Sequence, residues 1–198
     1  MKKIPLIIAS TLLATGLSFA QVHIGGHAAV NFSTLWGDGA SNMEIPWSLG
    51  VTAGAAAKIA VNEKFTVVPE LDLDLRRQTD DVITWTTWAI DIPVLVRFNA
   101  MPQLFFEAGP QIDLLLSSKI ERDLDPAPET INLGDSKALK TFEIGIDVGA
   151  GYSVTQNLDL NVRFAVGLTS IVDGTKFDGD DEAFRNMQIQ VGGTYWFM

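Results

Sequence analysis

The sequence predicts an all-β protein, an eight-stranded antiparallel up-and-down transmembrane β-barrel preceded by a cleavable signal peptide. The first observation is that long runs of alternating apolar and polar residues fill the chain after residue 20, a pattern typical of strands with two different faces. The second is that short turns alternate with longer connections between these runs, as in barrels that cross an outer membrane. The third is that aromatic residues gather at the ends of the apolar faces, where a bilayer interface selects them.

The N-terminal residues have the three parts of a secretory signal peptide. Met1-Lys2-Lys3 is positively charged, residues 4–17 are mostly apolar, and Ser18-Phe19-Ala20 places small residues before Gln21. This pattern predicts cleavage between Ala20 and Gln21. A membrane anchor or a buried first helix is the alternative, but the apolar run is short for a membrane span. We therefore expect two parts, a signal peptide at 1–20 and one outer-membrane β-barrel domain at 21–198.

Eight alternating runs follow the signal peptide, and most are longer than the five or six residues usual in a soluble sheet. Their lengths suit strands that cross a bilayer at a tilt, which need about 9–11 residues. The expected strands are 22–33, 47–60, 65–76, 82–98, 104–117, 140–154, 158–170 and 185–197. The expected tight turns are 61–64, 99–103 and 155–157. The longer connections are 34–46, 77–81, 118–139 and 171–184.

Each run has one apolar and one polar face. In the third, the odd positions from Phe65 to Leu75 are apolar, while the even positions include Glu70, Asp72 and Asp74. The fifth and sixth runs reverse the parity and place Glu107, Asp113, Glu143 and Asp147 at odd positions. The seventh alternates from Leu158 to Leu168 with Arg163 on its polar face, and the eighth from Met187 to Phe197. Small residues on the polar faces suit the crowded inside of a narrow barrel, and they include Gly50, Gly54, Ala56, Gly109, Gly145, Gly149 and Gly167.

A lipocalin-like barrel or a β-sandwich is the soluble alternative, because alternation alone does not tell the inside from the outside. The apolar faces favour the membrane barrel over the soluble alternative. They are nearly free of charge, and their aromatic residues form two groups that would make girdles at the membrane interfaces. The group at the turn end is Phe65, Phe98, Phe106, Tyr152, Tyr195 and Phe197, and the group at the loop end is Phe32, Trp47 and Phe142.

Several strands resemble one known family. The run Ile90-Asp91-Ile92-Pro93-Val94-Leu95-Val96-Arg97-Phe98 resembles a strand of PorT-type outer-membrane β-barrel proteins, and Phe105-Phe106-Glu107-Ala108-Gly109-Pro110 is similar to the next strand of that family. Similarity extends over residues 142–152, 166–171 and 185–197. The resemblance implies a barrel in the outer membrane and, for PorT itself, a part in protein secretion and gliding. The ending with Tyr195 and Phe197 also resembles the signal read by the barrel-assembly machinery, although Met198 follows.

The polar faces predict a charged barrel interior. Its candidate cluster is Glu70, Asp72, Asp74, Asp91, Arg97, Glu107, Asp113, Glu143, Asp147 and Arg163. From the tight turns we expect Arg163 to lie diagonal to Asp147, its main partner, and Arg97 to lie diagonal to Glu107. Side chains fill an eight-stranded barrel, so this cluster is interpreted as a polar core of ion pairs. A narrow cation path or a cation site is the alternative.

Composition argues against several other functions. The formal net charge is −10 and the pI is near 4.5, which argues against nucleic acid as a partner. The chain has no cysteine, so disulfides, cysteine metal sites and thiol nucleophiles are excluded. His23 and His27 are the two histidines, and no serine motif accompanies them. We therefore expect neither an enzyme nor a cofactor.

The longer connections carry the remaining charge. Segment 171–184 contains Asp178-Gly179-Asp180-Asp181-Glu182. It is interpreted as a solvated acidic loop, with calcium binding as the alternative.

The expected partners are outer-membrane lipid and lipopolysaccharide, the barrel-assembly machinery and envelope proteins. Candidate contacts to lipopolysaccharide phosphates are Lys119, Arg122, Lys137, Lys140 and Arg185. We expect an outer-membrane protein with a structural or binding-platform role, both termini in the periplasm and the long loops outside the cell. The alternatives are a PorT-like secretion component and a narrow cation-conducting barrel.

Overall fold

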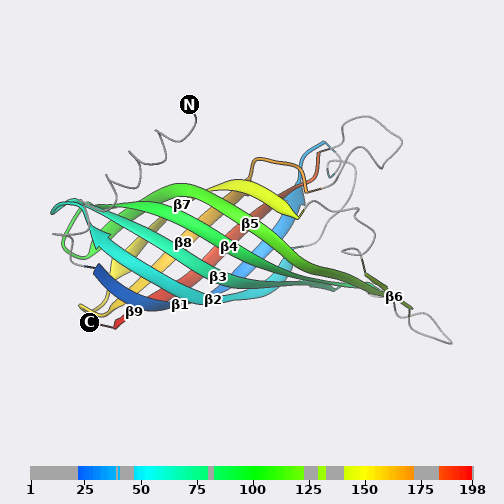
Figure 1. Cartoon of the computed structure of the whole chain (residues 1–198), viewed down its shortest axis with the longest axis horizontal. Helices are drawn as coiled ribbons and strands as arrows, with labels where there is room; N and C mark the ends of the chain where they lie inside the picture. Colours follow the sequence, from blue (N-terminus) through cyan, green and yellow to red (C-terminus); the bar gives the residue numbers. More distant parts are fainter. Residues whose placement is uncertain are drawn as a thin grey trace, which may run out of the picture.

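The computed structural model describes residues 22–38, 40, 47–79, 83–122, 129–132, 141–171 and 183–197. All strands of this part of the chain belong to one antiparallel sheet (Figure 1). Their bounds are β1 (Val22–Trp36), β2 (Ser48–Ala60), β3 (Phe65–Thr79), β4 (Ile83–Asn99), β5 (Leu104–Arg122), β6 (Glu129–Asn132), β7 (Phe142–Ser153), β8 (Leu158–Gly167) and β9 (Arg185–Phe197). No helix among these residues is long and apolar enough to span a membrane.

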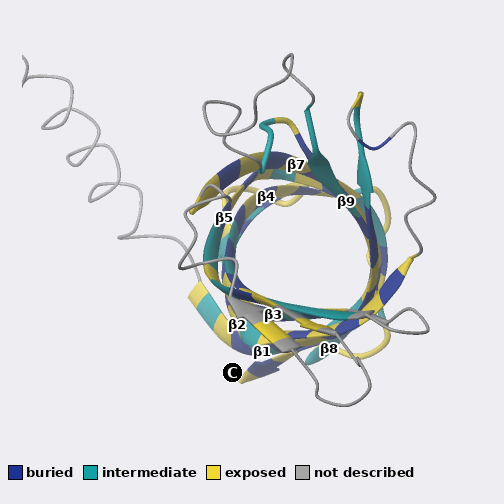
Figure 2. Ribbon diagram, turned by 90° about the vertical axis from the view of Figure 1, so that its right-hand side faces the viewer, coloured by how far each residue is buried: buried dark blue, intermediate teal, exposed yellow. Residues whose placement is uncertain are grey.

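The sheet closes on itself. The described strands follow the order β4-β3-β2-β1-β9-β8-β7-β5, and β5 pairs again with β4. The first and last strands meet with Ile24 opposite Phe197 and Trp36 opposite Arg185. Viewed along its axis, the ribbon forms a complete ring (Figure 2). The predicted eight-stranded antiparallel barrel is therefore confirmed in the described part of the chain.

Strand β6 is an addition to the predicted set and lies within segment 118–139, which was expected to be a loop. Strand β5 continues past the predicted end at residue 117, because its last residues still pair with the start of β4. Strand β6 pairs with this extension, with Lys119 opposite Asn132 and Arg122 opposite Glu129. The resulting arm projects beyond the barrel at one end (Figure 1).

The two ends of the barrel differ, and we call them the turn end and the loop end. Residues 61–64, 100–103 and 154–157 connect neighbouring strands at the turn end, where Val22 and Phe197 also lie. Backbone hydrogen bonds such as Val61 N–H to Phe65 O, 2.9 Å, close these turns. The loop end carries the arm formed by β5 and β6. The connection predicted at 77–81 also lies here but spans only residues 80–82, because β3 continues to Thr79, which pairs with Thr84.

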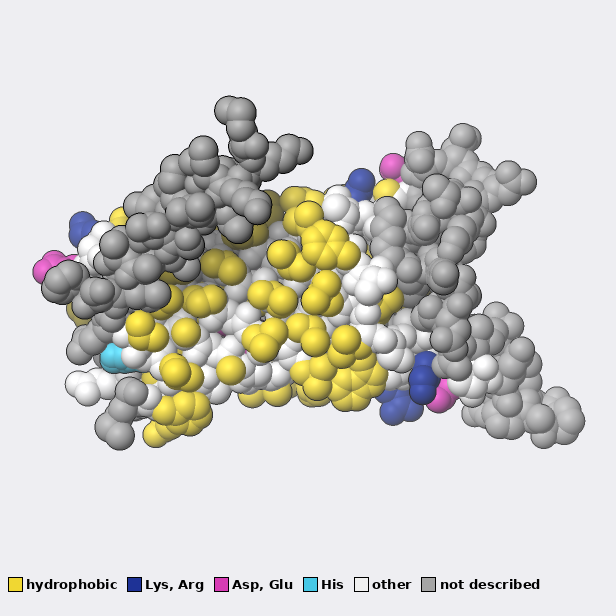
Figure 3. Space-filling model, viewed as in Figure 1, with side chains coloured by type: hydrophobic (Ala, Val, Ile, Leu, Met, Phe, Trp, Pro, Cys, Tyr) yellow, Lys and Arg dark blue, Asp and Glu magenta, His cyan; other side chains and the backbone are white. Residues whose placement is uncertain are grey.

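The outside of the barrel is apolar and the inside is polar, the reverse of a soluble barrel. Outward side chains such as Ile24, Leu71 and Val162 are 60%, 56% and 53% exposed. Apolar side chains cover the middle of the visible face, and charged ones lie near its two ends (Figure 3). Because exposing such a surface to water is unfavourable, a bilayer is the environment that this face fits.

Aromatic side chains border the apolar surface at both ends, as the sequence predicts. All nine expected girdle residues are more than a third exposed. At the turn end, the Phe65 and Phe98 ring centroids are 5.4 Å apart, and those of Tyr195 and Phe197 are 5.7 Å apart. These positions match the aromatic belts that mark the two interfaces of a membrane.

Candidate functional site

The candidate site is the polar interior of the barrel. All ten residues of the predicted interior cluster face inward and are buried, with at most 7% of any residue exposed. Their charges separate into two layers along the barrel axis. The ion-pair belt, nearer the turn end, consists of Lys58, Glu70, Arg97, Glu107, Asp159 and Arg163. The acidic layer, nearer the loop end, consists of Asp72, Asp74, Arg76, Asp91, Asp113, Glu143 and Asp147.

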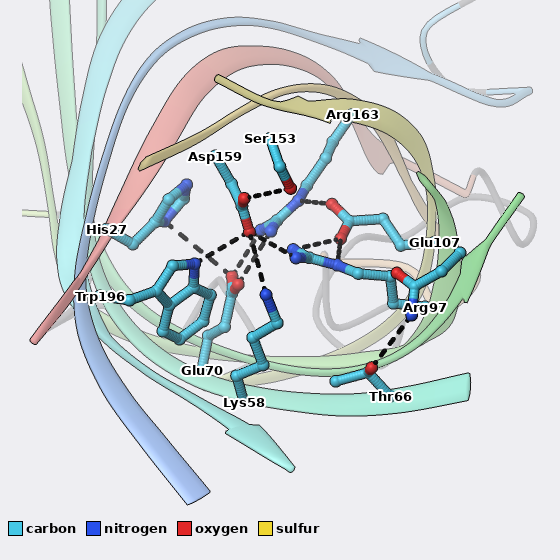
Figure 4. A network of polar contacts seen from close by, with 11 residues as sticks. His27, Lys58, Thr66, Glu70, Arg97, Glu107, Ser153, Asp159, Arg163 and Trp196 are labelled. Atoms are coloured by element: carbon cyan, nitrogen blue, oxygen red, sulfur yellow. Dashed lines mark hydrogen bonds and ion pairs between the residues drawn. The ribbon is translucent and has the colours of Figure 1, made fainter. Parts of the chain in front are cut away.

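Arg163 is the central cation of the belt. Its Nη1 and Nη2 donate to the two carboxylate oxygens of Glu70, at 2.5 and 2.8 Å, and its Nε donates to Glu107 Oε1 at 2.6 Å. Glu70 lies on β3, Glu107 on β5 and Arg163 on β8, so the contacts cross the lumen (Figure 4). Gly149 lies between Glu107 and Arg163 in the sheet, and a Cβ there would come within 2.9 Å of Arg163 Cγ. The glycine therefore leaves room for the aliphatic part of the Arg163 side chain.

Arg97 extends the belt towards the turn end. Its Nη2 donates to Glu107 Oε2 at 3.0 Å and its Nη1 to Asp159 Oδ2 at 2.6 Å. The guanidinium carbon lies 3.6 Å from the centroid of the Phe105 ring, a cation–π contact. Charge-assisted hydrogen bonds thus join Glu70, Arg163, Glu107, Arg97 and Asp159 in one continuous chain.

Asp159 is the other end of that chain. Its Oδ1 accepts from Ser153 Oγ at 2.6 Å, and its Oδ2 accepts from the indole nitrogen of Trp196 at 2.9 Å. The Lys58 ammonium lies 3.9 Å from the same Oδ2. The alternation predicts that Asp159 and Lys58 face inward, although the ten-residue candidate cluster leaves them out, and sequence reasoning did not place Trp196 in the site. The inward position of Trp196 could have been predicted from the alternation, because Trp196 lies between the outward Tyr195 and Phe197.

Two predicted contacts need correction. The predicted register of β7 and β8 is confirmed, with Asp147 opposite Ala165, but Arg163 pairs with Glu70 and Glu107 rather than Asp147. The long side chain reaches over Gly149 to Glu107 and across the lumen to Glu70. Arg97 lies directly opposite Glu107, not diagonal to it, because β4 continues to Asn99 and the turn begins one residue later than expected.

In the acidic layer carboxylates outnumber cations, unlike in the ion-pair belt. Asp72, Asp91, Asp113 and Glu143 lie directly opposite one another on the successive strands β3, β4, β5 and β7. Arg76 is the one inward-facing cation of this layer among the described residues, and it contacts Asp74 and Asp91. Like charges directly opposite in a sheet destabilise it. This arrangement therefore needs further positive charge or protons to be stable.

His27 is the histidine that joins the two layers. It is buried, and its Nδ1 lies 3.4 Å from Asp72 Oδ1 and 3.9 Å from Glu70 Oε2. Ligand atoms of these three residues lie within 4.8 Å of one another, which is close enough to hold a metal ion. However, both oxygens of Glu70 already accept from Arg163, so a positive charge occupies this position. His23 is only partly buried near the start of β1.

The remaining predicted residues are placed as follows. Tyr195 and Phe197 point outward at the turn end and are 54% and 57% exposed. Arg185 stacks over Trp36, at 5.0 Å from the ring centroid, and its Nε donates to the Leu168 carbonyl. Lys119 is exposed near the tip of β5. The cleavage site at Ala20 and Gln21, the acidic residues 178–182, Lys137, Lys140 and the Arg122 side chain lie outside the described residues.

The fold and the interior define a class, a transmembrane β-barrel filled by polar side chains. Residues 19–173 match the family described as outer membrane protein beta-barrel domain, and the chain belongs to this family. The protein is therefore an outer-membrane protein.

Among solved structures, the chain is similar to Neisserial surface protein A, with 12% identity, a TM-score of 0.55 and coverage of 88% of this chain and 97% of that chain. It is also similar to Ail, the attachment invasion locus protein of Yersinia pestis, with 10% identity, a TM-score of 0.55 and coverage of 89% and 99%. No curated protein matches the chain.

Proposed function

We propose that this protein is a non-conducting, non-enzymatic barrel with a structural or binding-platform role, which holds its loop-end segments at the cell surface. The observation that carries the proposal is the ion-pair belt. Its salt bridges link β3, β4, β5 and β8 across the lumen, and the side chains of Glu70, Arg97, Glu107, Asp159 and Arg163 are at most 1% exposed. A barrel filled in this way leaves its loops and arm as the parts available to partners.

A narrow cation-conducting barrel is the second candidate, and the acidic layer favours it. A cation that enters from the loop end meets carboxylates first, but it then reaches Arg163 and Arg97. Passage would require it to separate salt bridges of 2.5 to 3.0 Å in a low-dielectric interior. The belt therefore supports a barrel that is closed to ions.

Conductance in planar bilayers tests this choice. We expect the purified wild-type protein to give no steady single-channel steps in KCl, and the double variant Arg97→Ser, Arg163→Ser to give small cation-selective steps because the belt is then open. The matched control is Lys64→Ser, which removes an exposed cation at the turn end and should remain silent. Steady cation-selective steps from the wild type would contradict the proposal in favour of the conducting barrel.

The orientation in the membrane is a separate prediction. We expect protease added to whole cells to cut within 37–47, 123–141 or 168–184, and to spare 61–64, 100–103 and 154–157. The reason is that outer-membrane barrels place long loops outside and short turns in the periplasm, which would also place Val22 and Phe197 there. If cysteines introduced into the short turns react with an impermeant reagent on intact cells, the orientation is the opposite of the one predicted.

Partners follow from this placement. The exposed aromatic residues Tyr195 and Phe197 support recognition by the barrel-assembly machinery, and the apolar surface supports contact with lipid and lipopolysaccharide. A PorT-like role in a secretion apparatus is the alternative to a general platform, and it rests on the resemblance of residues 90–98 and 105–110. Cross-linking in whole membranes followed by purification separates the two. A stable complex with secretion-apparatus proteins would favour the PorT-like role.

A further inference from the structure

We propose that Asp91 and Asp113 share one proton at neutral pH, and that this proton makes the stability of the barrel sensitive to the pH at its loop end. The two residues lie directly opposite each other on β4 and β5, and their carboxyl groups are within hydrogen-bonding reach of each other. An ionised carboxylate accepts hydrogen bonds but donates none. The contact is therefore favourable only when one of the two groups carries a proton.

The surroundings of this pair are strongly negative. Titratable groups face it from both neighbouring strands, and they are Asp72, Asp74 and Arg76 on β3 and Glu143 and Asp147 on β7. On the other strands, His27 faces Asp72, and Arg163 is held by Glu70 and Glu107 in the ion-pair belt. Two carboxylates in contact do not both stay ionised unless positive charge lies beside them.

Arg76 supplies only part of that positive charge. Its Nε donates to Asp74 on the same strand, whereas its Nη2 lies 3.4 Å from Asp91 Oδ2. Asp74 also accepts from Asn31 Nδ2 and Thr52 Oγ1, so it is a well-satisfied carboxylate that holds the guanidinium. One guanidinium does not balance Asp74 and two further carboxylates. A proton on the pair reduces this excess of negative charge.

The pair also contains a buried oxygen that lacks a donor. Asp91 is 2% exposed, and its Oδ1 receives no hydrogen bond from the described residues. A buried carboxylate oxygen without a donor is costly. Asp113, by contrast, already accepts from Gln111 Nε2 on its own strand. A proton shared between the two aspartates meets the need of Asp91, because it turns one of two acceptors into a donor.

Asp113 connects the pair with the loop end. It is 7% exposed and lines a cavity of about 70 Å³ whose walls also include Ser48 and Trp85. Towards the turn end, the salt bridges of the ion-pair belt cross the lumen. The pair therefore exchanges its proton with water from the loop end. This inference does not depend on the platform role of the barrel.

A shared proton makes the barrel less stable as the pH rises. At neutral pH the folded barrel holds one proton more than the unfolded chain, in which both aspartates are ionised. Because the folded state binds more protons, the free energy of unfolding decreases with increasing pH. One proton changes the folding equilibrium constant by up to about tenfold per pH unit. Its loss leaves two like charges directly opposite on β4 and β5, which destabilises their pairing.

Urea unfolding of the barrel refolded in lipid vesicles tests the proposal between about pH 6 and about pH 9. We expect the wild-type midpoint to fall steadily across this range. Asp113→Asn and, separately, Asp91→Asn should give midpoints that change little with pH, because the amide donates to the remaining carboxylate and keeps the shape of the side chain. Glu63→Gln, in an exposed turn, is the matched control and should keep the wild-type pH dependence. Heat-modifiable migration shows whether each variant is folded.

Infrared spectroscopy separates a shared proton from other sources of pH dependence. A protonated carboxyl group has a C=O stretch distinct from the bands of a carboxylate. We expect this stretch in the folded wild type at neutral pH and a weaker one in Asp113→Asn. If the wild type lacks it, if Asp113→Asn retains it in full, or if the wild-type midpoint does not fall with pH, the proposal is wrong. It is also wrong if both asparagine variants lose stability with pH as steeply as the wild type.

Discussion

Replacing Arg163 with alanine is expected to lower the free energy of unfolding by about 3–5 kcal/mol, the usual cost of removing one partner from a buried ion pair. The substitution leaves both oxygens of Glu70 and one oxygen of Glu107 without the donors that hold them at 2.5 to 2.8 Å. It also removes the contacts that tie β8 to β3 and β5. The measurement is the urea midpoint of the barrel refolded in lipid vesicles, followed by heat-modifiable migration.

The partner carboxylate provides the internal control for this result. Adding Glu70→Gln to Arg163→Ala should recover part of the lost stability, because the uncompensated charge disappears while the shape is kept. Lys64→Ala, at an exposed turn, should leave the midpoint almost unchanged. An Arg163→Ala protein that unfolds like the wild type would show that water, rather than Arg163, neutralises Glu70 and Glu107.

A charge placed on the outside of the barrel should have an effect of similar size. Val162 is 53% exposed near the middle of β8 and lies opposite Val191 and Ala150 on the neighbouring strands. Val162→Arg is expected to destabilise the barrel in a bilayer by about 2–4 kcal/mol, the cost of an arginine near the bilayer midplane. In water the same exposed position would tolerate arginine readily.

The experiment therefore compares variants of the barrel in lipid vesicles. Unfolding in lipid vesicles should show the full loss of stability, whereas Val162→Ile should behave like the wild type. Lys64→Asp, in a short turn, should also change the stability little, because that position lies outside the apolar surface. Equal stability of the Val162→Arg and wild-type proteins in vesicles would mean that this face of the barrel does not contact lipid.

The period of two along the chain was enough to predict most of the fold. It identified the strands of the barrel and the face of each strand, since apolar and polar residues alternate regularly. It failed where pairing changes locally. A bulge between Trp88 and Ala89 shifts the register of β4 and β5, and Ser118 becomes the buried residue beyond it. Nothing in the alternation marks this shift or the short strand β6.

The interior was predictable as a set of residues but not as a set of pairs. Cross-strand arithmetic describes neighbours in the sheet, and it correctly placed Asp147 opposite Ala165. The pairs of the belt instead depend on how the sheet curls into a ring. Arg163 and Glu70 lie on strands that are not adjacent, and their contact follows from the diameter and stagger of the closed barrel, which no single turn determines.

The closing pair β1 and β9 has a consequence for how the protein must fold. Ile24 and Phe197 are neighbours in the sheet, although almost the whole described chain separates them. Contacts between such distant residues form slowly because the entropy of closing so long a loop must be overcome first. Until then, β1 and β9 each expose a row of unpaired backbone groups beside an apolar surface, and such edges are prone to aggregate. Until the barrel closes, both edges of this topology must therefore be kept apart from other chains.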